Sequence, residues 1–410
     1  MQTQLSEEHK NSAKGQEADA ILRSCVHCGF CTATCPTYQL LGDELDSPRG
    51  RIYLIKQLLE GNKITESTQQ HLDRCLTCRA CETTCPSGVR YGRLVDIGRE
   101  IVEKKIPRSL WQNIKRHSLR KLVEAPKLFN VAVNIGNLLK PILPGDIKNK
   151  VPAKQQLLTK KSSTHVRRML ALSGCGQSVV TPNTNIAATN VLSKLGIQLI
   201  EPQPALCCGS VSHHMSAPDA AHYHMRRLID QWWSYIEPSD GTAGIEAIII
   251  TASGCGATVK EYGDILKHDA DYAEKAARVS ELAKDLCEVI VSEPLDQFVN
   301  EKRNKIAFHS PCTLQHAQQL NGVVETILEQ IGFELTHVAD SHLCCGSADT
   351  YSILQPKLSK KLLDNKLSNL ENDQPELIVT ANIGCQLHLM TKANTPVKHW
   401  IELLASKLDT

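Results

Sequence analysis

Eight cysteines near the N-terminus have the spacing of ligands to iron–sulfur clusters. The pattern C-x2-C-x2-C-x3-C-P occurs twice, first at Cys25, Cys28, Cys31 and Cys35 before Pro36, and again at Cys75, Cys78, Cys81 and Cys85 before Pro86. Three thiolates two residues apart can bind three irons of one cubane, while the fourth cysteine, followed by proline, binds the other cluster. The pattern therefore predicts two 4Fe–4S clusters. One would be held by Cys25, Cys28, Cys31 and Cys85, and the other by Cys75, Cys78, Cys81 and Cys35.

A pair of structural zinc sites is the alternative for these eight cysteines. Zinc normally needs four ligands arranged as two CxxC pairs, so a tripled spacing with a trailing Cys-Pro argues against zinc. Because the whole pattern occurs twice, the cluster interpretation is favoured.

The C-terminal part of the chain carries two further groups of four cysteines. They are Cys175, Cys207, Cys208 and Cys255, and then Cys312, Cys344, Cys345 and Cys385. Adjacent cysteines rarely form a disulfide with each other, because the ring would be strained, whereas two neighbouring thiolates and two more could bind a metal or cluster. The glycine after each pair suits a turn with positive φ. Buried small hydrophobic side chains are the alternative, and Cys287 is expected to be one of these.

The spacing of these cysteines shows an internal repeat. Corresponding cysteines are offset by 137, 137 and 130 residues, and 32 residues separate the first cysteine from the pair in both copies. Strand-like runs at 169–172, 247–251, 305–308 and 377–380 alternate with helical stretches, which predicts two fused α/β domains with mainly parallel sheets. The cysteines would then lie beyond the carboxyl ends of strands, where such folds place their sites. The stretches 279–290 and 397–408 at the end of each copy are interpreted as amphipathic helices.

The N-terminal cysteines are expected to lie in an α-helical ferredoxin domain. Between the two motifs, Ser47-Pro48 predicts the start of a helix through Leu59 that ends at Gly61, and Thr65 or Ser67 could cap a second helix. Arg49 and Arg51 on the first helix would contact a carboxylate or a neighbouring surface, with a solvated helix face as the alternative.

Charge separates the two cysteine-rich parts. Residues 104–168 contain 16 Lys and Arg against Glu124 and Asp146, a net charge of +14, although the whole chain of 410 residues has only +2. This stretch is interpreted as a connector that prolines break into short pieces, and as a docking segment for anionic lipid or an acidic partner. A solvated linker is the alternative. The balanced total charge gives no reason to expect nucleic acid as a partner.

These features predict a multidomain α+β protein. Residues 1–103 would form the ferredoxin domain with two clusters, 104–165 the basic linker, and 166–295 and 303–410 the two α/β domains. The polar N-terminus predicts no signal peptide, and 17 cysteines in a reducing compartment favour metal or redox chemistry over disulfides. No dinucleotide-binding, Walker A or Ser/His/Asp motif is recognisable, so no substrate-oxidising centre is expected on this chain.

The motifs resemble those of a known family. Two ferredoxin motifs followed by two CCG (cysteine-rich) domains are similar to subunits of glycolate oxidase, anaerobic glycerol-3-phosphate dehydrogenase and heterodisulfide reductase. The stretches HLDRCLTCRACETTCPSGVRYGRLVDIGR, TASGCGATVKEYG and DSHLCCGSA resemble most the iron–sulfur subunits of glycolate oxidase.

This resemblance implies a subunit of a bacterial glycolate dehydrogenase whose electron acceptor is neither NAD nor oxygen. Flavin-binding glycolate oxidase subunits, which carry the FAD, would oxidise glycolate to glyoxylate, and this chain would relay electrons towards the quinone pool. It would be peripheral, on the cytoplasmic side of the inner membrane.

One departure from the family pattern concerns the CCG domains. Ala252 and Asn382 stand where the fuller pattern has a fifth cysteine, which argues against a five-thiolate cluster and against disulfide reduction. A four-cysteine cluster or zinc remains open. Three alternative functions also remain: the same relay for another 2-hydroxy acid or glycerol 3-phosphate flavoprotein, a CCG-type thiol–disulfide enzyme, and a zinc-bound scaffold.

Overall fold

Two compact units make up the chain, and each is built from several stretches of sequence. The computed structural model describes residues 1–148, 151–161, 163–239, 241, 243–299 and 303–408. The first unit contains Met1–His117, His214–Pro218 and His342–Lys366; the second contains Ser118–His213, Asp219–Ser341 and Leu367–Thr410.

The N-terminal part of the first unit is helical, as predicted. Its helices are α1 (Glu7–Lys10), α2 (Ala13–Ser24), α3 (Phe30–Ala33), α4 (Pro36–Leu41), η1 (Glu44–Asp46), α5 (Pro48–Leu59), α6 (Glu66–Asp73), α7 (Ala80–Thr83) and α8 (Tyr91–Lys105). Buried side chains from α2, α5 and α8, among them Leu22, Ile55 and Leu94, form its hydrophobic core. These longer helices thereby hold the cysteine loops between them.

The predicted helix caps between the two motifs are confirmed. The Ser47 hydroxyl accepts a hydrogen bond from the Gly50 amide at 3.0 Å, and Pro48 occupies the first turn of α5. Thr65 caps α6 through a reciprocal capping box with Thr68. Each cap satisfies amides that the first helical turn leaves without a partner.

The second unit contains two four-stranded parallel sheets with the same strand order. The first sheet runs β2-β1-β3-β4 and the second β6-β5-β7-β8. The strands are β1 (Arg167–Ala171), β2 (Ile197–Ile200), β3 (Ile248–Ile250), β4 (Ala283–Asp285), β5 (Lys305–His309), β6 (Glu334–Leu335), β7 (Leu377–Thr380) and β8 (Val397–His399). This shared order confirms the predicted duplication and parallel α/β class.

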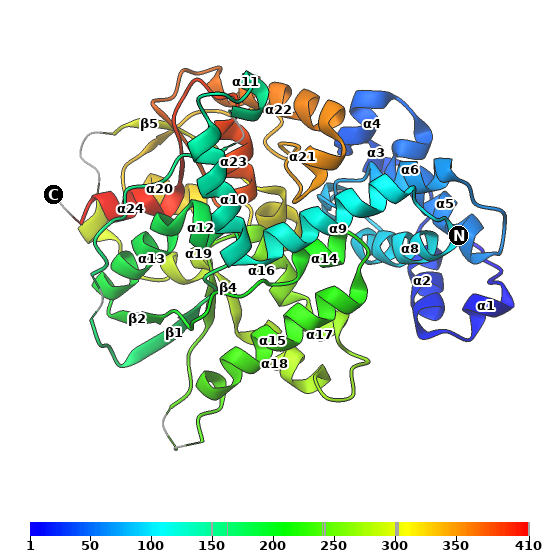
Figure 1. Cartoon of the computed structure of the whole chain (residues 1–410), viewed down its shortest axis with the longest axis horizontal. Coiled ribbons are helices and arrows are strands. Elements are labelled where there is room, and N and C mark those ends of the chain that lie inside the picture. The colour runs from blue at the N-terminus through cyan, green and yellow to red at the C-terminus, as the bar shows by residue number, and fades with distance from the viewer. Residues whose placement is uncertain (149–150, 162, 240, 242, 300–302, 409–410) are drawn as a thin grey trace. The chain divides into compact units, whose positions relative to one another are not determined.

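Helices cover both sheets. Those of the second unit are α12 (Gln177–Val180), α13 (Pro182–Lys194), α14 (Ser210–His214), α15 (Pro218–Ile236), α16 (Ser253–Lys260), α17 (Tyr262–Ile265), α18 (Ala273–Leu282), α19 (Leu286–Ile290), η2 (Asp296–Phe298), the π-helical turn η3 (Thr313–Ala317), α20 (Val323–Gln330), α23 (Ile383–Met390) and α24 (Trp400–Ser406). The remaining two helices of this part of the chain, α21 (Tyr351–Leu354) and most of α22 (Pro356–Glu371), belong to the first unit. Within the second unit, α13 and α24 pack side by side although they come from different repeats (Figure 1).

Alternating strand residues divide the core into two layers. In β1, Met169 and Ala171 face a core shared with Phe308, Val379 and other residues of the second sheet. Leu170, between them, faces a separate core formed with α15 and α18. Because successive strand residues point to opposite faces, this alternation buries both faces of the first sheet. The two repeats therefore share one apolar core.

The prediction of amphipathic helices at 279–290 and 397–408 was wrong in part. Each stretch contains a short edge strand, β4 or β8, and the C-terminal half of each forms α19 or α24. Both strands show a buried–exposed–buried pattern over three residues. Three residues are too few to distinguish strand alternation from the helical period in the sequence.

The basic stretch at 104–165 is not broken into short irregular pieces as expected. It forms α9 (Leu110–Glu124), α10 (Pro126–Leu139) and the single turn α11 (Gly145–Lys148). Pro126 occupies the first turn of α10, where its missing amide has no hydrogen bond to lose. This proline therefore starts a helix instead of preventing one.

The cap of α24 predicts an acid-sensitive fold in the second unit. The buried His399 ring lies 2.9 Å from the Thr251 carbonyl through Nε2, and Nδ1 accepts a hydrogen bond from the Ile401 amide. Burial lowers the pKa of His399 to about 4. Below pH ~6.5 the unfolded chain takes up a proton that the folded chain resists until about pH 4. We therefore expect the full contribution of His399 to the free energy of unfolding above pH ~6.5. About 3 kcal/mol of it should be lost as the pH falls from ~6.5 to about 4.

Urea unfolding of the wild-type chain and His399→Gln over this pH range tests the prediction. Asp285, the counterpart of His399 in the first repeat, also titrates in this range, because burial raises its pKa to about 6. The difference in unfolding free energy between wild type and variant therefore reports on His399 alone. We expect the variant to have the shallower acid dependence. Identical pH profiles would contradict the role assigned to His399.

Candidate metal centres

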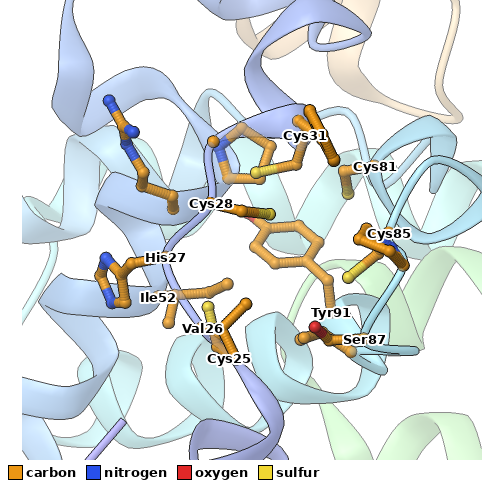
Figure 2. Close-up of a pocket in the computed structure, with 16 residues that line it drawn as sticks. Cys25, Val26, His27, Cys28, Cys31, Ile52, Cys81, Cys85, Ser87 and Tyr91 are labelled. Carbon is orange, nitrogen blue, oxygen red and sulfur yellow. The ribbon is translucent and has the colours of Figure 1, made fainter.

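Four predicted ligands from both N-terminal motifs line one pocket. The side chains of Cys25, Cys28, Cys31 and Cys85 surround a cavity of about 430 Å³, counting the space open to solvent (Figure 2). The ring of Tyr91 and apolar side chains such as Ile52 complete its wall. The fourth cysteine of the second motif thus joins the first three of the first motif.

The second set of predicted ligands lines another pocket of about 300 Å³. Its walls include Cys35, Cys75, Cys78 and Cys81. Cys81 and Tyr91 border both pockets, so the two sites are neighbours within the first unit.

Two loops of matching conformation present the first three thiols of each motif. His27 and Gly29 have positive φ (55° and 88°), and the corresponding residues of the second loop, Thr77 and Arg79, have φ of 52° and 61°. A non-glycine residue with positive φ carries backbone strain of about 1–2 kcal/mol. Such strain persists where the surroundings fix the backbone, and it clusters at functional sites.

Cationic side chains surround Cys75 in the second pocket. Burial favours the neutral thiol, but Arg51 and Arg99, together with hydrogen bonds from Tyr91 and the Thr77 amide, lower the pKa of Cys75. Arg99 also fixes the loop, because its guanidinium donates to the Leu72 and Cys75 carbonyls at 2.8 and 2.6 Å. The Thr77 amide donates to the Cys75 sulfur at 3.4 Å. These groups favour the thiolate, the form that binds metal.

The sulfur-only donor sets and their surroundings fit a 4Fe–4S cluster in each pocket. Each pocket combines three thiols of one tight loop with the fourth cysteine of the other motif, which is the arrangement of two-cluster ferredoxins. By contrast, the group of Asp43, Asp46 and His71 is not a convincing cation site. Arg51 and Arg74 already bind the Asp46 carboxylate at 3.2 and 2.8 Å.

In the first repeat, three of the four C-terminal cysteines lie together in the second unit. The Cys175 and Cys207 sulfurs are 3.6 Å apart, and Cys208 follows in the same turn. The Tyr262 hydroxyl donates to the Cys208 carbonyl at 2.6 Å. The neighbouring thiols Cys175 and Cys208, together with burial, raise the pKa of Cys207 strongly.

The fourth cysteine of this repeat, Cys255, lies on α16 beyond the end of β3. It is close enough to act electrostatically on Tyr262, as do Cys207 and Cys208.

The cysteines of the second repeat are divided between the units. Cys344 and Cys345 belong to the first unit, while Cys312 and Cys385 belong to the second. Asn382, which stands where the fuller family pattern has a fifth cysteine, occupies the N-cap position of α23. Its side-chain amide donates to the Cys385 sulfur at 3.4 Å, and its carbonyl oxygen accepts from the Gly254 amide. An amide thus contacts the sulfur at the position of the absent thiolate.

Both cysteine pairs sit in the same kind of turn. Gly209 and Gly346 have φ of 83° and 89°, as their sequence position predicted. The amide of each glycine donates to the sulfur of the first cysteine of its pair, Cys207 or Cys344, at 3.4 Å.

Several residues around the N-terminal centres were missed in the sequence. Tyr91 donates to the Cys75 sulfur at 3.5 Å, and both Tyr91 and Arg99 lie on α8, after the second motif. Tyr351, far along the chain but within the first unit, donates to the carbonyl of Arg74, the residue before Cys75, at 3.0 Å. The sequence spacing of Tyr91, Arg99 and Tyr351 forms no recognisable pattern. Only the position of α8, directly after the second motif, could have indicated Tyr91 and Arg99.

Two family models match parts of this chain. The model of the 4Fe–4S dicluster domain family matches residues 21–89, and the model of the cysteine-rich domain family matches residues 169–260 and 306–390. A dicluster domain joined to two cysteine-rich domains defines an iron–sulfur protein of the oxidoreductase class.

Two full-length relatives narrow this class. The chain is 56% identical over 410 residues to the glycolate oxidase iron–sulfur subunit of Escherichia coli, covering 100% of both chains. It is 30% identical to the probable glycolate oxidase iron–sulfur subunit of Bacillus subtilis, covering 93% of this chain and 91% of that one. The chain belongs to the family of glycolate oxidase iron–sulfur subunits. A more distant relative, lactate utilization protein A of Bacillus licheniformis, is 24% identical over 57% of this chain and 97% of its own length.

Proposed function

We propose that this chain is the electron-transfer subunit of a glycolate dehydrogenase complex. The observation that carries the proposal is the pair of neighbouring thiol pockets, each combining cysteines of both motifs, in a chain with a full-length relative of this family. When bound, the two 4Fe–4S clusters would supply one-electron carriers. Cys25, Cys28, Cys31 and Cys85 would hold one, and Cys75, Cys78, Cys81 and Cys35 the other.

The chain's own residues would hold these carriers close together and adjust them. Tyr91 borders both pockets, and Arg51 and Arg99 place positive charge beside Cys75. Positive charge and hydrogen bonds to the sulfurs stabilise the more negatively charged state of a site, so these residues are expected to raise its reduction potential.

The partners belong to the same proposal. Flavin-binding subunits would oxidise glycolate to glyoxylate, and the electrons would pass through this chain towards quinone, with peripheral contact on the cytoplasmic side of the inner membrane. Two observations support this division of labour: the sequence has no recognisable nucleotide-binding motif, and its relatives are named as subunits. In the part of the chain that the structure describes, no helix is long and apolar enough to cross a membrane. We retain 1–103, 104–165, 166–295 and 303–410 as the proposed functional segments.

Separate replacement of Cys35 and Cys85, the fourth cysteines of the two motifs, tests the ligand assignment. We expect about eight irons per wild-type chain after anaerobic purification, and about four in Cys85→Ser or Cys35→Ser. Electron paramagnetic resonance after dithionite reduction should show that each variant loses a different cluster signal. Cys287→Ala, which removes a buried thiol of the second unit, is the control and should keep the wild-type iron. Unchanged iron in Cys85→Ser and Cys35→Ser would contradict the assignment, and zinc in place of iron would indicate the scaffold instead.

The identity of the flavoprotein partner is a separate question. A relay for another 2-hydroxy acid would purify with a different flavoprotein, and the similarity to lactate utilization protein A gives this alternative a specific basis. Affinity purification of the tagged chain from its own cells, followed by substrate-dependent dye reduction with glycolate, lactate and glycerol 3-phosphate, distinguishes these cases. If the dye were reduced faster with lactate than with glycolate, lactate would replace glycolate as the proposed substrate of the complex.

A further inference from the structure

Helix α10 exposes a continuous apolar face that no described part of the chain covers. Leu128, Val131, Ile135, Leu138 and Leu139 are between 40% and 79% exposed. At about 100° per residue, these five positions fall within an arc of roughly 100° on the helix. We call them the α10 stripe.

The opposite face of α10 holds the helix against the second unit. It packs on α12, and the Asn137 side chain donates to the Pro152 carbonyl at 3.0 Å. The Lys140 ammonium donates to the Val151 carbonyl at 3.0 Å. These contacts lie on the side of α10 opposite the α10 stripe, so the stripe is the face that is left exposed.

Positive charge accompanies the α10 stripe. Residues 118–161 contain nine Lys and Arg against Glu124 and Asp146, a net charge of +7, and α10 itself contains no acidic residue. Lys121 and Lys127 are exposed near its start, and Glu124 is buried in an ion pair with His224 at 3.3 Å. The surroundings of the stripe therefore favour an anionic partner.

We propose that α10 is a docking helix for an anionic lipid bilayer and lies in the plane of the membrane interface. The α10 stripe would enter the boundary between headgroups and acyl chains, while flanking lysines meet the headgroups, as in interfacial amphipathic helices. A protein partner is less well matched, because the stripe is entirely aliphatic and lacks the Trp, Tyr and Arg side chains that dominate protein interfaces. The helix has 14 residues, about 21 Å, which is too short to cross a bilayer.

This inference rests on the membrane contact of the proposed function, and it narrows the expected docking segment, residues 104–168, to one helix. Arg116 on α9 belongs to the basic stretch, but its guanidinium donates to the Met215 carbonyl at 3.0 Å within the first unit. Lys115 likewise donates to the Ile353 carbonyl at 3.1 Å. These two side chains are engaged by the protein, which leaves the lipid contact to the α10 stripe and the lysines near it.

Vesicle co-sedimentation of the purified, cluster-loaded chain tests the proposal. The probes are vesicles of equal parts phosphatidylglycerol and phosphatidylcholine, and vesicles of phosphatidylcholine alone. We expect binding to the anionic vesicles that weakens as salt is added, and weak binding to the neutral ones. Val131→Gln/Ile135→Gln/Leu138→Gln should lower the affinity for anionic vesicles by about tenfold or more, because it removes the side chains that would enter the bilayer.

A matched triple variant controls for loss of exposed apolar side chains in general. Val166→Gln/Tyr223→Gln/Val299→Gln changes three exposed positions elsewhere in the second unit and should bind like the wild type. Iron content and circular dichroism establish that both variants fold. Equal vesicle binding by the stripe variant and the wild type would overturn the proposal. The proposal would also be overturned if the wild type did not bind vesicles and the stripe variant lost a protein partner or self-association. Failure of the electron relay leaves the vesicle assay unaffected, so the two proposals are tested separately.

Discussion

Replacing Arg51 with methionine should destabilise the first unit by about 3–5 kcal/mol, because it leaves a buried carboxylate with fewer partners. Arg51 is 1% exposed and its partner Asp46 is 0% exposed. The guanidinium donates to the His71 carbonyl at 2.7 Å, the Thr37 hydroxyl at 3.1 Å and the Asp46 carboxylate at 3.2 Å. Methionine has similar length but no donor, so all three acceptors lose a buried hydrogen bond.

Arg49 offers a control on the same helix. It pairs with the Glu44 carboxylate at 2.6 Å, but both side chains are partly exposed, at 37% and 44%. Exposed ion pairs contribute about 0–1 kcal/mol, so Arg49→Met should have a small effect. Arg51→Lys should fall between the two, because one ammonium cannot reproduce the fork of a guanidinium.

Hydrogen exchange measured by mass spectrometry can resolve these effects within one unit. Peptides from α5 and α6 should exchange faster in Arg51→Met, while peptides from α13 in the second unit serve as an internal reference. Equal acceleration by Arg49→Met and Arg51→Met would show that burial of the pair does not determine its contribution.

The sequence predicted the helical N-terminal part and the duplicated domains because each has a strong local signal. Ser47-Pro48 and Thr65 are caps whose chemistry acts within one helical turn, and the equal cysteine offsets reveal the duplication. The grouping of Cys85 with the first motif also followed from a local rule, the proline after the fourth cysteine.

The features that were missed depend on contacts distant in sequence. The expected contact of Arg49 and Arg51 with a carboxylate is confirmed, but nothing near Arg51 indicates that it is also buried against the His71 carbonyl, twenty residues away. Tyr351 reaches the Arg74 carbonyl across 277 residues. The edge strands β4 and β8 are defined by pairing with β3 and β7, which a three-residue pattern cannot reveal.

The turn of the first cysteine pair should be highly sensitive to an added methyl group. A Cβ on Gly209 would lie 2.9 Å from the Ala221 carbonyl oxygen and 3.3 Å from a carbon of the Met225 side chain. Since φ is 83°, alanine would also carry about 1–2 kcal/mol of backbone strain. We expect Gly209→Ala to cost about 3 kcal/mol or more in total, because the clash is with backbone that cannot rotate away.

Gly196→Ala separates the clash from the strain, because Gly196 has a similar φ of 76° and open space around its Cβ position. Its cost should be limited to about 1–2 kcal/mol of strain. Urea unfolding of the second unit, followed by hydrogen exchange in β1 and α15, measures both variants. Because the Gly209 amide donates to the Cys207 sulfur, Gly209→Ala should also change the reactivity of Cys207 towards a thiol reagent, whereas Gly196→Ala should not. Equal losses of stability in the two variants would mean that φ alone requires glycine in the cysteine-pair turn, and that the close approach of α15 does not.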